Sequence, residues 1–428
     1  MQVKIFPSKI SGELNAPASK SSMQRACAAA LLHTGITEIK NQGTSNDDKT
    51  ALNIISQLGA VITLKGEILC IKSYGFPRGF NAADKIIHCG ESGLSVRMFT
   101  PIAALCEQKI ILKGEGSLAR RPMDFFDKIL PQLGVEINSD NGKLPLEIEG
   151  PLEPVDISVD GSLSSQFLTG LLFAFGASVQ HPVTISVNDL KSKPYIDLTL
   201  DVMKYFDYSI INHNFQEFII SKKNDDVDSV IYYTVEGDWS SASFLLVAGA
   251  IAGSVRVSGL DVNSSQADKA IIKVLRDCGA EVVISKDFVQ VNKDSLQAFT
   301  FDATDCPDLF PPLVALAAYC KGDSVIKGTH RLAAKESNRT ETLQEVFGLM
   351  GIDILLENDE MIIKGGGPLR EAEISSHNDH RIAMAGAVAA LGATGCITIT
   401  HAEAINKSYP GFFEDIKKIG AALEITEP

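Results

Sequence analysis

The residues of this chain best suited to bind an anion lie in one short stretch, 17–25. Small and hydroxyl-bearing residues there lead into an Ala- and Leu-rich run, 26–32, which indicates the start of a helix. Two hydroxyls and Lys20 would surround the unpaired N–H groups of that start, with Arg25 about one turn further on. Free N–H donors, the helix dipole and fixed cations would all attract the same anion. An ordinary capped helix with a solvated lysine is the alternative for this stretch taken alone.

More cations occur in short segments further along the chain. Any one of these segments could be a solvated helix face, a turn or a single salt bridge. The formal net charge is −14, so Lys and Arg concentrated in a few segments are informative. Arg suits carboxylate and phosphate oxygens bidentately, and Lys serves as a point charge, so the set predicts substrates with several negative charges. The segments are Arg97, 120–122, 191–195, 335–339, 379–381 and 407–410.

Two carboxylates belong to the same set of segments. Asp308 stands at a predicted helix start, and Glu336 lies inside a cationic segment. A carboxylate surrounded by cations is a candidate for proton transfer, so both are candidate catalytic groups.

A local repeat predicts the elements that must position these groups. A helix-like segment ends in an apolar residue, and a Gly then precedes an apolar residue that opens an alternating strand. Asp207 takes the place of the Gly in one copy, and a left-handed residue at a helix end explains both residue types. The spacing of about 70 residues is that of a structural repeat. The six pivots are 59, 134, 207, 279, 351 and 420.

Each repeat also contains a second helix with a polar head and an almost wholly apolar body. A helix that is apolar on every side is buried on every side, so only its ends come near water. We therefore expect six strand–helix–strand–helix–strand units whose polar heads share a surface; the alternative is an ordinary doubly wound α/β enzyme. The heads are 19–21, 91–93, 162–166, 237–241, 305–308 and 378–381, and the bodies include 167–175, 244–252 and 382–391.

Composition bounds the class of protein. A chain of 428 residues with 45% hydrophobic content can bury two cores, so two domains are expected. No apolar run is long enough to span a bilayer, and the first residues do not resemble a signal peptide. Eight scattered cysteines without a Cys-x-x-Cys pair predict free thiols in the cytoplasm and no structural zinc site. The acidic charge argues against a nucleic-acid partner.

At this point the ordered segments resemble one family, the 5-enolpyruvylshikimate-3-phosphate (EPSP) synthases, or 3-phosphoshikimate 1-carboxyvinyltransferases. The resemblance runs nearly end to end. The segments that carry it are 17–25, 90–97, 121–122, 164–166, 192–197, 237–238 with 240–243, 307–308, 335–339, 378–381, and Lys407 with Pro410.

The resemblance implies an α/β enolpyruvyl transferase fold, an inside-out α/β barrel of two similar domains. Each domain would hold three βαβαββ-type repeats: 19–232 the first domain, and 1–18 with 233–428 the second, with the active site in the cleft between them. The reaction would move the enolpyruvyl group of phosphoenolpyruvate onto the 5-hydroxyl of shikimate-3-phosphate and release phosphate, on the route to chorismate and the aromatic amino acids. The family implies a cytoplasmic monomer without a metal or organic cofactor, in which glyphosate competes with phosphoenolpyruvate.

The resemblance also implies roles for single residues. Asp308 would take the proton of the attacking hydroxyl, and Glu336, assisted by Lys20, would protonate the enol carbon. Residues implied to hold shikimate-3-phosphate are Lys20, Ser21, Arg25, Ser164, Ser165, Gln166, Ser192, Tyr195, Asp308 and Lys335. Residues implied to hold phosphoenolpyruvate are Lys20, Gly93, Arg121, Gln166, Arg339, Arg381 and Lys407.

The chain departs from the family pattern at a few positions. Glu91 and Leu94 replace the usual Asn and Thr beside Gly93, so only a backbone role is expected for that loop. Arg331 stands where Asn is common, and Asn338 replaces a common Asp. Two other functions stay open: a UDP-N-acetylglucosamine enolpyruvyl transferase, which usually carries a reactive Cys in the loop here formed by 114–119, and a non-catalytic anion-binding relative.

Overall fold

The protein was analysed as a computed structural model that describes residues 1–78, 80, 85–223 and 229–427. The chain divides into two compact units, Met1–Ser19 with Glu236–Pro428, and Lys20–Val235. The division expected from the sequence fell at 18/19 and 232/233, and the second of these points lies inside strand β14 (Ser229–Thr234). All of β14 pairs with β3 (Thr34–Lys40), which is why the compact unit extends to Val235.

One repeat shows the plan of all six. It contains β6 (Lys85–His88), α3 (Gly93–Ala103), β7 (Ile110–Lys113), α4 (Asp124–Ile129), β8 (Glu136–Ser139) and β9 (Leu146–Glu149). The sheet order is β6-β7-β9-β8, in which the first pair is parallel and the other two are antiparallel. This is the βαβαββ unit that the family resemblance implies, with one strand more at its end than the strand–helix–strand–helix–strand pattern predicted from the repeat.

The other repeats follow the same plan, and each unit holds three four-stranded sheets. Lys20–Val235 also contains α1 (Lys20–Leu32), β3, α2 (Asn46–Gln57), β4 (Val61–Lys65) and β5 (Ile68–Tyr74), then β10 (Ile157–Asp160), α5 (Ser165–Ser178), β11 (Val183–Asn188), α6 (Lys193–Tyr205), β12 (Ser209–His213) and β13 (Glu217–Ser221).

The unit made of Met1–Ser19 and Glu236–Pro428 contains the remaining elements. They are β1 (Gln2–Phe6), β2 (Ile10–Asn15), α7 (Trp239–Ala252), β15 (Gly253–Ser258), α8 (Ile271–Asp277), β16 (Glu281–Ile284), β17 (Phe288–Asn292), β18 (Thr300–Asp302), α9 (Phe310–Ala317), β19 (Gly322–Lys327), α10 (Arg339–Leu349), β20 (Asp353–Glu357), β21 (Glu360–Gly365), β22 (Ala372–Ser375), α11 (His380–Ala390), β23 (Ile397–Thr400), α12 (Phe412–Lys418) and β24 (Ala422–Thr426).

Two strands are exchanged between equivalent repeats. β2, which precedes α1, pairs in parallel with β15, whereas β14, which precedes α7, pairs in parallel with β3. The N-terminal strand β1 lies between β23 and β24 and completes the last sheet. The chain therefore leaves one compact unit after Ser19 and returns to it at Glu236.

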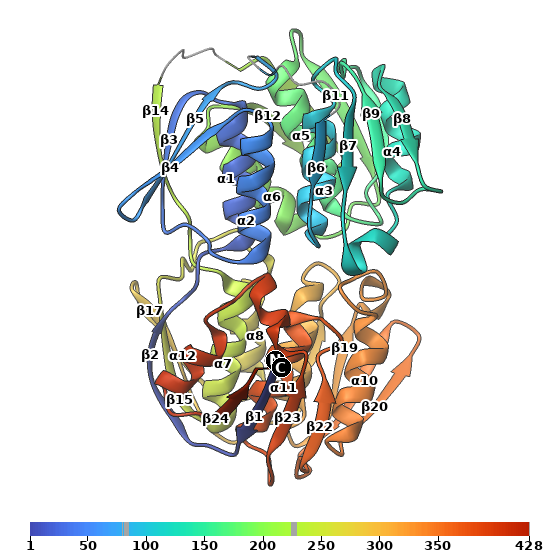
Figure 1. Ribbon diagram of the computed structural model, residues 1–428. Coiled ribbons are helices and arrows are strands. Elements are labelled where there is room, and N and C mark those ends of the chain that lie inside the picture. Colours follow the sequence, from blue (N-terminus) through green and yellow to red (C-terminus); the bar gives the residue numbers. More distant parts are fainter. Residues whose placement is uncertain (79, 81–84, 224–228, 428) are drawn as a thin grey trace. The chain divides into compact units, whose positions relative to one another are not determined.

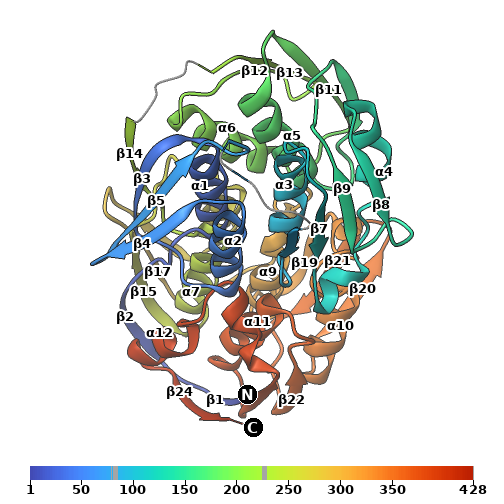
Figure 2. The same cartoon turned by 45° about the horizontal axis from the view of Figure 1, so that its top comes forward.

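The helices with polar heads form the core of each unit. All residues of α3 and α11 are buried, and so is every residue of α7 except Ser240. In both ribbon views α1, α3 and α5 lie inside the sheets of their unit (Figure 1, Figure 2). The predicted buried helices are confirmed, because their bodies carry almost no polar side chain that would need water.

The six predicted pivots all have left-handed backbone conformations. Gly59, Gly134, Gly279, Gly351 and Gly420 have φ between 79° and 111°, and Asp207 has φ 62°. Each stands near the end of a helix, where the left-handed residue turns the chain towards the next strand. The pivot prediction is confirmed at every copy.

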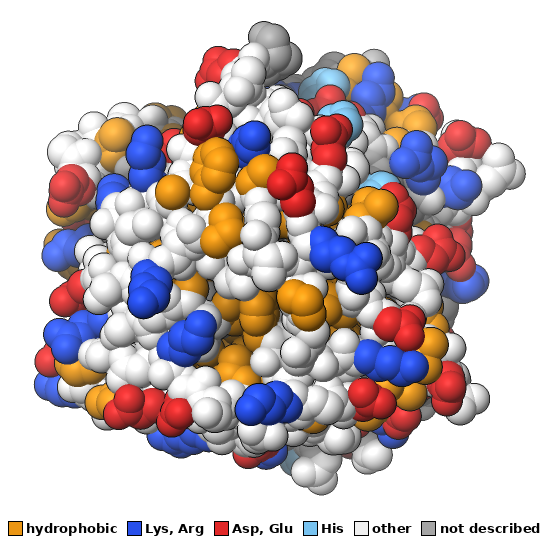
Figure 3. All heavy atoms as spheres, turned by 90° about the horizontal axis from the view of Figure 1, so that it is seen from below, with side chains coloured by type: hydrophobic (Ala, Val, Ile, Leu, Met, Phe, Trp, Pro, Cys, Tyr) orange, Lys and Arg blue, Asp and Glu red, His pale blue; other side chains and the backbone are white. Residues whose placement is uncertain are grey.

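The surface carries charges of both signs. On the face drawn in Figure 3, Lys, Arg, Asp and Glu side chains are interspersed around apolar side chains near the middle. Within the described residues, no helix is both long and apolar enough to cross a membrane.

Candidate active site

In the unit that contains the C-terminus, three helix starts bring charged side chains together. Asp308 lies in the short helix η4 (Pro307–Leu309) just before α9, Arg339 is the first residue of α10, and Arg381 is the second residue of α11. Lys335 and Glu336 precede α10 in the connecting loop. α11 packs against both α9 and α10, so residues more than 70 positions apart in the sequence meet at one end of the helices.

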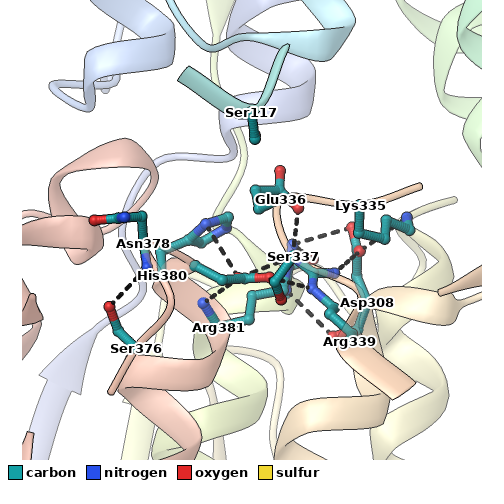
Figure 4. Close-up of polar contacts among 12 residues, drawn as sticks. Ser117, Asp308, Lys335, Glu336, Ser337, Arg339, Ser376, Asn378, His380 and Arg381 are labelled. Atoms are coloured by element: carbon teal, nitrogen blue, oxygen red, sulfur yellow. Dashed lines mark hydrogen bonds and ion pairs between the residues drawn. The ribbon is translucent and has the colours of Figure 1, made fainter. Parts of the chain in front are cut away.

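Arg339 is the centre of this cluster and is fully buried. Its guanidinium donates to Asp308 Oδ1 at 2.7 Å, to Glu336 Oε2 at 2.7 Å and to Asp379 Oδ2 at 2.8 Å. Figure 4 shows these contacts converging from three segments. Asp379 also caps α11 by accepting from the backbone N–H of Arg381 at 3.0 Å. One buried arginine thus holds both candidate catalytic carboxylates beside a helix start.

Asp308 is held by three cations. Besides Arg339, Lys335 Nζ lies 3.1 Å from Oδ1, and Arg381 Nη2 lies 3.1 Å from Oδ2. Burial alone would raise the pKa of Asp308, but Arg381, Lys335 and Arg339 hold it well below its ordinary value. Burial also lowers the pKa of Lys335. Asp308 is therefore a carboxylate across the physiological pH range.

In the unit Lys20–Val235, a second group surrounds Gly93. A Cβ placed on Gly93 would lie 2.9 Å from Arg121 Nη1, 3.6 Å from Arg97 Nη1 and 3.7 Å from Gln166 Oε1. Arg97 Nη1 donates to Gln166 Oε1 at 2.9 Å, and Arg121 Nη2 donates to Ser117 Oγ at 3.1 Å. Glycine at 93 leaves space for a ligand atom beside two guanidinium groups at a helix N-terminus.

Arg25 ties α1 to α6 in the same unit. It is buried, and its guanidinium donates to Thr199 Oγ1 at 2.8 Å, to the Ser21 carbonyl at 2.8 Å and to the Tyr195 carbonyl at 3.2 Å. These bonds hold the start of α1 against the start of α6, where Ser192 is the N-cap residue with φ 56°. Predicted substrate residues from two helix starts are thereby joined, and their contact with substrate stays a prediction.

Lys20 pairs with a carboxylate that the sequence reasoning did not select. Its Nζ lies 2.9 Å from Asp47 Oδ2 in the first turn of α2. Ser45 caps that helix in a capping box with Asp48, which presents the acidic first turn towards α1. The signal available in the sequence was the Ser45 to Asp48 helix-start pattern.

Ser164, Ser165 and Lys407, which are also predicted site residues, lie at or in helices. Ser164 is the N-cap of α5, and its side chain accepts from the backbone N–H of Gln166 at 3.3 Å. Ser165 is the first residue of that helix. Lys407 is buried in the short helix η6 (Ala402–Lys407), which packs against α11.

Glu91, which replaces the usual Asn, lies against Gly116. A Cβ on Gly116 would collide with the Glu91 carboxylate, so this side chain lies directly on the turn that leads to Arg121. The backbone N–H of Glu115 also donates to the Gly90 carbonyl at 2.8 Å. The loop beside Gly93 is therefore bound to the arginine-bearing turn.

The sequence reasoning missed several supporting residues besides Asp47. Gln24 accepts from Ser95 Oγ at 3.0 Å and so links α1 to the start of α3. Asp379 holds Arg339, although its segment had been singled out for its cations. Asp379 belongs to the predicted polar head 378–381, and Gln24 lies in the predicted anion-binding stretch 17–25, so the available signal was a polar residue within a segment already selected.

This arrangement can bind anions and move protons. Each unit presents cations and helix N-termini, and one unit holds two carboxylates on a shared arginine. Such a pair suits reactions in which an acid and a base act on neighbouring atoms of anionic substrates. Among the described residues, no group of three or more His, Cys, Asp or Glu has the arrangement of a metal site.

Comparisons with known proteins agree with each other. The model of the family described as EPSP synthase (3-phosphoshikimate 1-carboxyvinyltransferase) matches residues 6–416. A 3-phosphoshikimate 1-carboxyvinyltransferase of Clostridium novyi (strain NT) is 36% identical over 429 residues, covering 99% of this chain and 98% of the relative. One from Clostridium perfringens (strain ATCC 13124) is 35% identical and covers 99% of both.

Solved structures match the whole chain as well. An EPSP synthase from Acinetobacter baumannii superposes with a TM-score of 0.83 at 25% identity, covering 100% of each chain. The enolpyruvyl transferase NikO from Streptomyces tendae has a TM-score of 0.78 at 17% identity, with 100% and 99% covered, and this likeness concerns the fold alone.

Proposed function

The chain belongs to the EPSP synthase (3-phosphoshikimate 1-carboxyvinyltransferase) family, and on that premise we propose that it transfers the enolpyruvyl group of phosphoenolpyruvate to the 5-hydroxyl of shikimate-3-phosphate and releases phosphate. The observation that carries the proposal is the cluster in which Asp308 and Glu336 share Arg339, with Lys335 and Arg381 beside them. The cluster supports the proposal because it brings two carboxylates, as candidate base and acid, together with cations that can bind anions.

Asp308 is the proposed base. With three cations around it, the carboxylate is ionised but weakly basic. A substrate carboxylate or phosphate that binds Arg339, Arg381 or Lys335 takes over part of their charge, so the basicity of Asp308 rises when substrates bind. The base therefore becomes effective only in the substrate complex, where the 5-hydroxyl proton is to be removed.

Glu336 is the proposed acid. In the structure its carboxylate accepts from Arg339 Nη2 at 2.7 Å. A phosphoenolpyruvate carboxylate on Arg339 would displace it from this ion pair and leave it able to hold a proton. Glu336 then protonates the methylene carbon, the deprotonated 5-hydroxyl bonds to the neighbouring carbon, and a tetrahedral ketal forms. Glu336 next takes a proton back from the methyl group while the C–O bond to phosphate breaks and the double bond re-forms, and the proton that Asp308 removed from the hydroxyl leaves with the phosphate.

The cations of both units are proposed to bind the two anionic substrates. Arg121 beside Gly93 supports a phosphoenolpyruvate contact there, and Arg339, Arg381 and Lys407 support contacts to the same substrate. The residues proposed for shikimate-3-phosphate are Lys20, Ser21, Arg25, Ser164, Ser165, Gln166, Ser192, Tyr195, Asp308 and Lys335, and those proposed for phosphoenolpyruvate also include Lys20 and Gln166. Fixed charges that offset substrate repulsion and support the departing phosphate account for these residue types.

The test is phosphate release with each substrate alone and with both. We expect release only when phosphoenolpyruvate and shikimate-3-phosphate are present together. UDP-N-acetylglucosamine in place of shikimate-3-phosphate should give none. Release with that nucleotide sugar, or no release with either acceptor, would contradict the proposal.

The variant Asp308→Asn tests the assignment of the base. It keeps a polar side chain in contact with Lys335 and Arg381 but has no basic oxygen, so kcat should fall by about a hundredfold or more. Calorimetry should still detect shikimate-3-phosphate binding. Asp294→Asn makes the same change at an exposed position of the same unit and should leave kcat unchanged. A near wild-type kcat in Asp308→Asn removes Asp308 from the base role.

A further inference from the structure

A buried carboxylate outside the proposed site is connected to it by hydrogen bonds. Asp268 lies in the short helix η3 (Ala267–Ala270) and is only 2% exposed. Ser240 Oγ is hydrogen-bonded to Asp268 Oδ2. Arg381 Nη2 lies 3.2 Å from that same Ser240 Oγ and 3.1 Å from Asp308 Oδ2. One arginine nitrogen is thus shared between Ser240 and Asp308.

The donors and acceptors in this series of hydrogen bonds follow from the chemistry of the three side chains. A guanidinium can only donate, so Ser240 Oγ accepts from Arg381. Ser240 has a single O–H, and with Asp268 ionised this O–H donates to Asp268 Oδ2. The order is Arg381 to Ser240 to Asp268, and Ser240 is the one residue of α7 that is not buried within the core.

The position of Asp268 is rigid. Two residues before it, the Gln266 side chain accepts from the backbone N–H of Trp239 at 2.9 Å and donates to the Gly237 carbonyl at 2.8 Å. η3 is thereby bound to the start of α7, which also carries Ser240. When a carboxyl group held in this way changes its charge, the change can act on Arg381 without a change of fold.

We propose that Asp268, acting through Ser240, positions Arg381 on the carboxylate of Asp308 and adjusts the strength of Asp308 as a base. This makes Asp268 a positioning residue, and the inference rests on the proposed function of Asp308. When Asp268 loses its proton, its negative charge draws Arg381 towards Ser240. Asp308 then has a weaker hold on Arg381 and becomes a stronger base.

Asp268 has the environment of a group that changes its charge near neutral pH. Within the described part of the chain, nothing hydrogen-bonds to its Oδ1, so an ionised carboxylate there is poorly compensated. Burial, followed by the charge of Asp308, raises the pKa of Asp268 to about 7, and Arg381 opposes this shift. The titratable groups that face it are Asp238 at the start of α7, Cys306 and Asp308 at η4, and Arg381 on α11.

The pH dependence of phosphate release tests this inference. In the wild type, kcat/KM should rise with pH through a step near neutrality, because that ratio reports groups of the free enzyme. Asp268→Asn can still accept from Ser240 but cannot ionise. We expect it to lack the step and to fall about tenfold below the wild type at pH 8, with unchanged affinity for shikimate-3-phosphate by calorimetry.

Variants of Ser240 keep the test independent of one substitution. Ser240→Ala removes the hydroxyl that links Arg381 to Asp268 and should lower kcat about tenfold. Ser240→Thr keeps a hydroxyl at this position, so its kcat should stay close to that of the wild type. Asp261→Asn removes a charge from the exposed segment before η3 and should leave the profile unchanged.

The outcomes separate the inference from the function on which it rests. A wild-type step that persists in Asp268→Asn, or equal rates for Ser240→Ala and Ser240→Thr, would overturn the inference while the function stands. A wild type that releases no phosphate would contradict the proposed function, and the inference would fall with it.

Discussion

At the scale of single residues, the charged groups of this protein satisfy each other in pairs that the substrates are proposed to replace. Arg339 holds three carboxylates and Lys20 holds Asp47, so in the structure the proposed anion-binding groups already have anionic partners. An arginine that keeps a carboxylate partner is oriented before any ligand arrives, which reduces the entropy lost on binding. Each substrate anion must then compete with a carboxylate of the protein, and this favours ligands that carry several negative charges at once.

The first prediction concerns the space between Gly93 and Arg121. In Gly93→Ala the new methyl group would lie 2.9 Å from Arg121 Nη1, so the guanidinium must move and the space beside it closes. KM for phosphoenolpyruvate should rise about tenfold, a loss typical of one displaced charge-assisted contact, while KM for shikimate-3-phosphate changes little. Steady-state kinetics with each substrate varied in turn measure this split.

Gly367→Ala is the matched control, because a Cβ there meets no atom within 4 Å. It should keep both KM values. Equal increases in both KM values for Gly93→Ala would argue against a phosphoenolpyruvate site at this glycine.

At the scale of elements, helix starts supply the chemistry and helix ends supply the turns. Ser92, Ser164, Asp238 and Asp379 cap their helices with side-chain hydrogen bonds, which leaves the neighbouring residues oriented at the helix N-termini. The apolar bodies fix these helices inside the sheets, so their starts have little freedom. Because the proposed reacting groups stand on packed helices and in the loops that lead directly into them, their relative positions within each unit are set by core packing.

The pivots make an element-scale prediction. Gly351 follows α10 with φ 91°, a conformation in which a side chain is strained, so Gly351→Ala should lower the free energy of unfolding by about 1 kcal/mol. Gly348, near the end of the same helix, has no atom within 4 Å of an added Cβ. Gly348→Ala should raise the free energy of unfolding by about 0.5 kcal/mol through helix propensity.

Urea unfolding of both variants against the wild type measures the difference. If the free energy of unfolding falls in Gly351→Ala and rises in Gly348→Ala, only three residues away, then the backbone conformation of Gly351 is the cause of its loss. A Gly351→Ala variant as stable as the wild type would contradict the assignment of this pivot.

At the scale of the whole molecule, the two compact units are joined by two chain crossings and an exchange of strands. β2 completes a sheet in one unit and β14 completes a sheet in the other, although each stands beside the opposite repeat in the sequence. The unit that contains Glu236–Pro428 therefore needs β1 and β2 from before the first crossing to complete its sheets, whereas the continuous segment Lys20–Val235 contains all strands of its own sheets. We infer that neither unit can be cut free at a single point in the chain.

Three carboxylates, Asp48, Asp268 and Asp308, predict how stability depends on pH; the first two are buried, and the Asp308 side chain is 20% exposed. Burial raises the pKa of Asp48 to about 6 and that of Asp268 to about 7, so the stability from their protonated forms is complete below the unfolded value of 3.8 and is lost as pH rises through 6 and 7. Asp308 acts in the opposite sense. Its pKa is lowered, so its stability is present above 3.8 and is lost as pH falls.

These groups together predict greatest stability near about pH 4, with a loss on the acid side from Asp308 and a loss on the basic side from Asp48 and Asp268, which urea midpoints at pH 3, 4, 5 and 8 can measure. Asp48→Asn and Asp268→Asn should each reduce the loss between pH 5 and 8. If the two variants lose as much stability over that interval as the wild type, the burial assigned to these carboxylates is not the cause.

Much of the architecture is encoded locally and was predictable from the sequence. A Gly or Asp after an apolar helix end specifies a left-handed turn, and a polar head before an apolar body specifies a buried helix with an accessible start. These are properties of a few neighbouring residues, which is why all six pivots and all six helices were found. The ordered motifs likewise identified the family from the sequence.

Only the tertiary structure decided which distant residues meet. Asp268, Asp308 and Arg381 come from three segments, and no local pattern connects them. The sequence predicted Asp308 and Arg381 as single residues, named Ser240 and Asp379 only as parts of polar helix heads, and missed Asp268 and Asp47, because a partner across the core is chosen by packing. The exchange of β2 and β14 has the same cause: the backbone of a strand can pair with any suitable edge, and its true partner emerges when the whole core is packed.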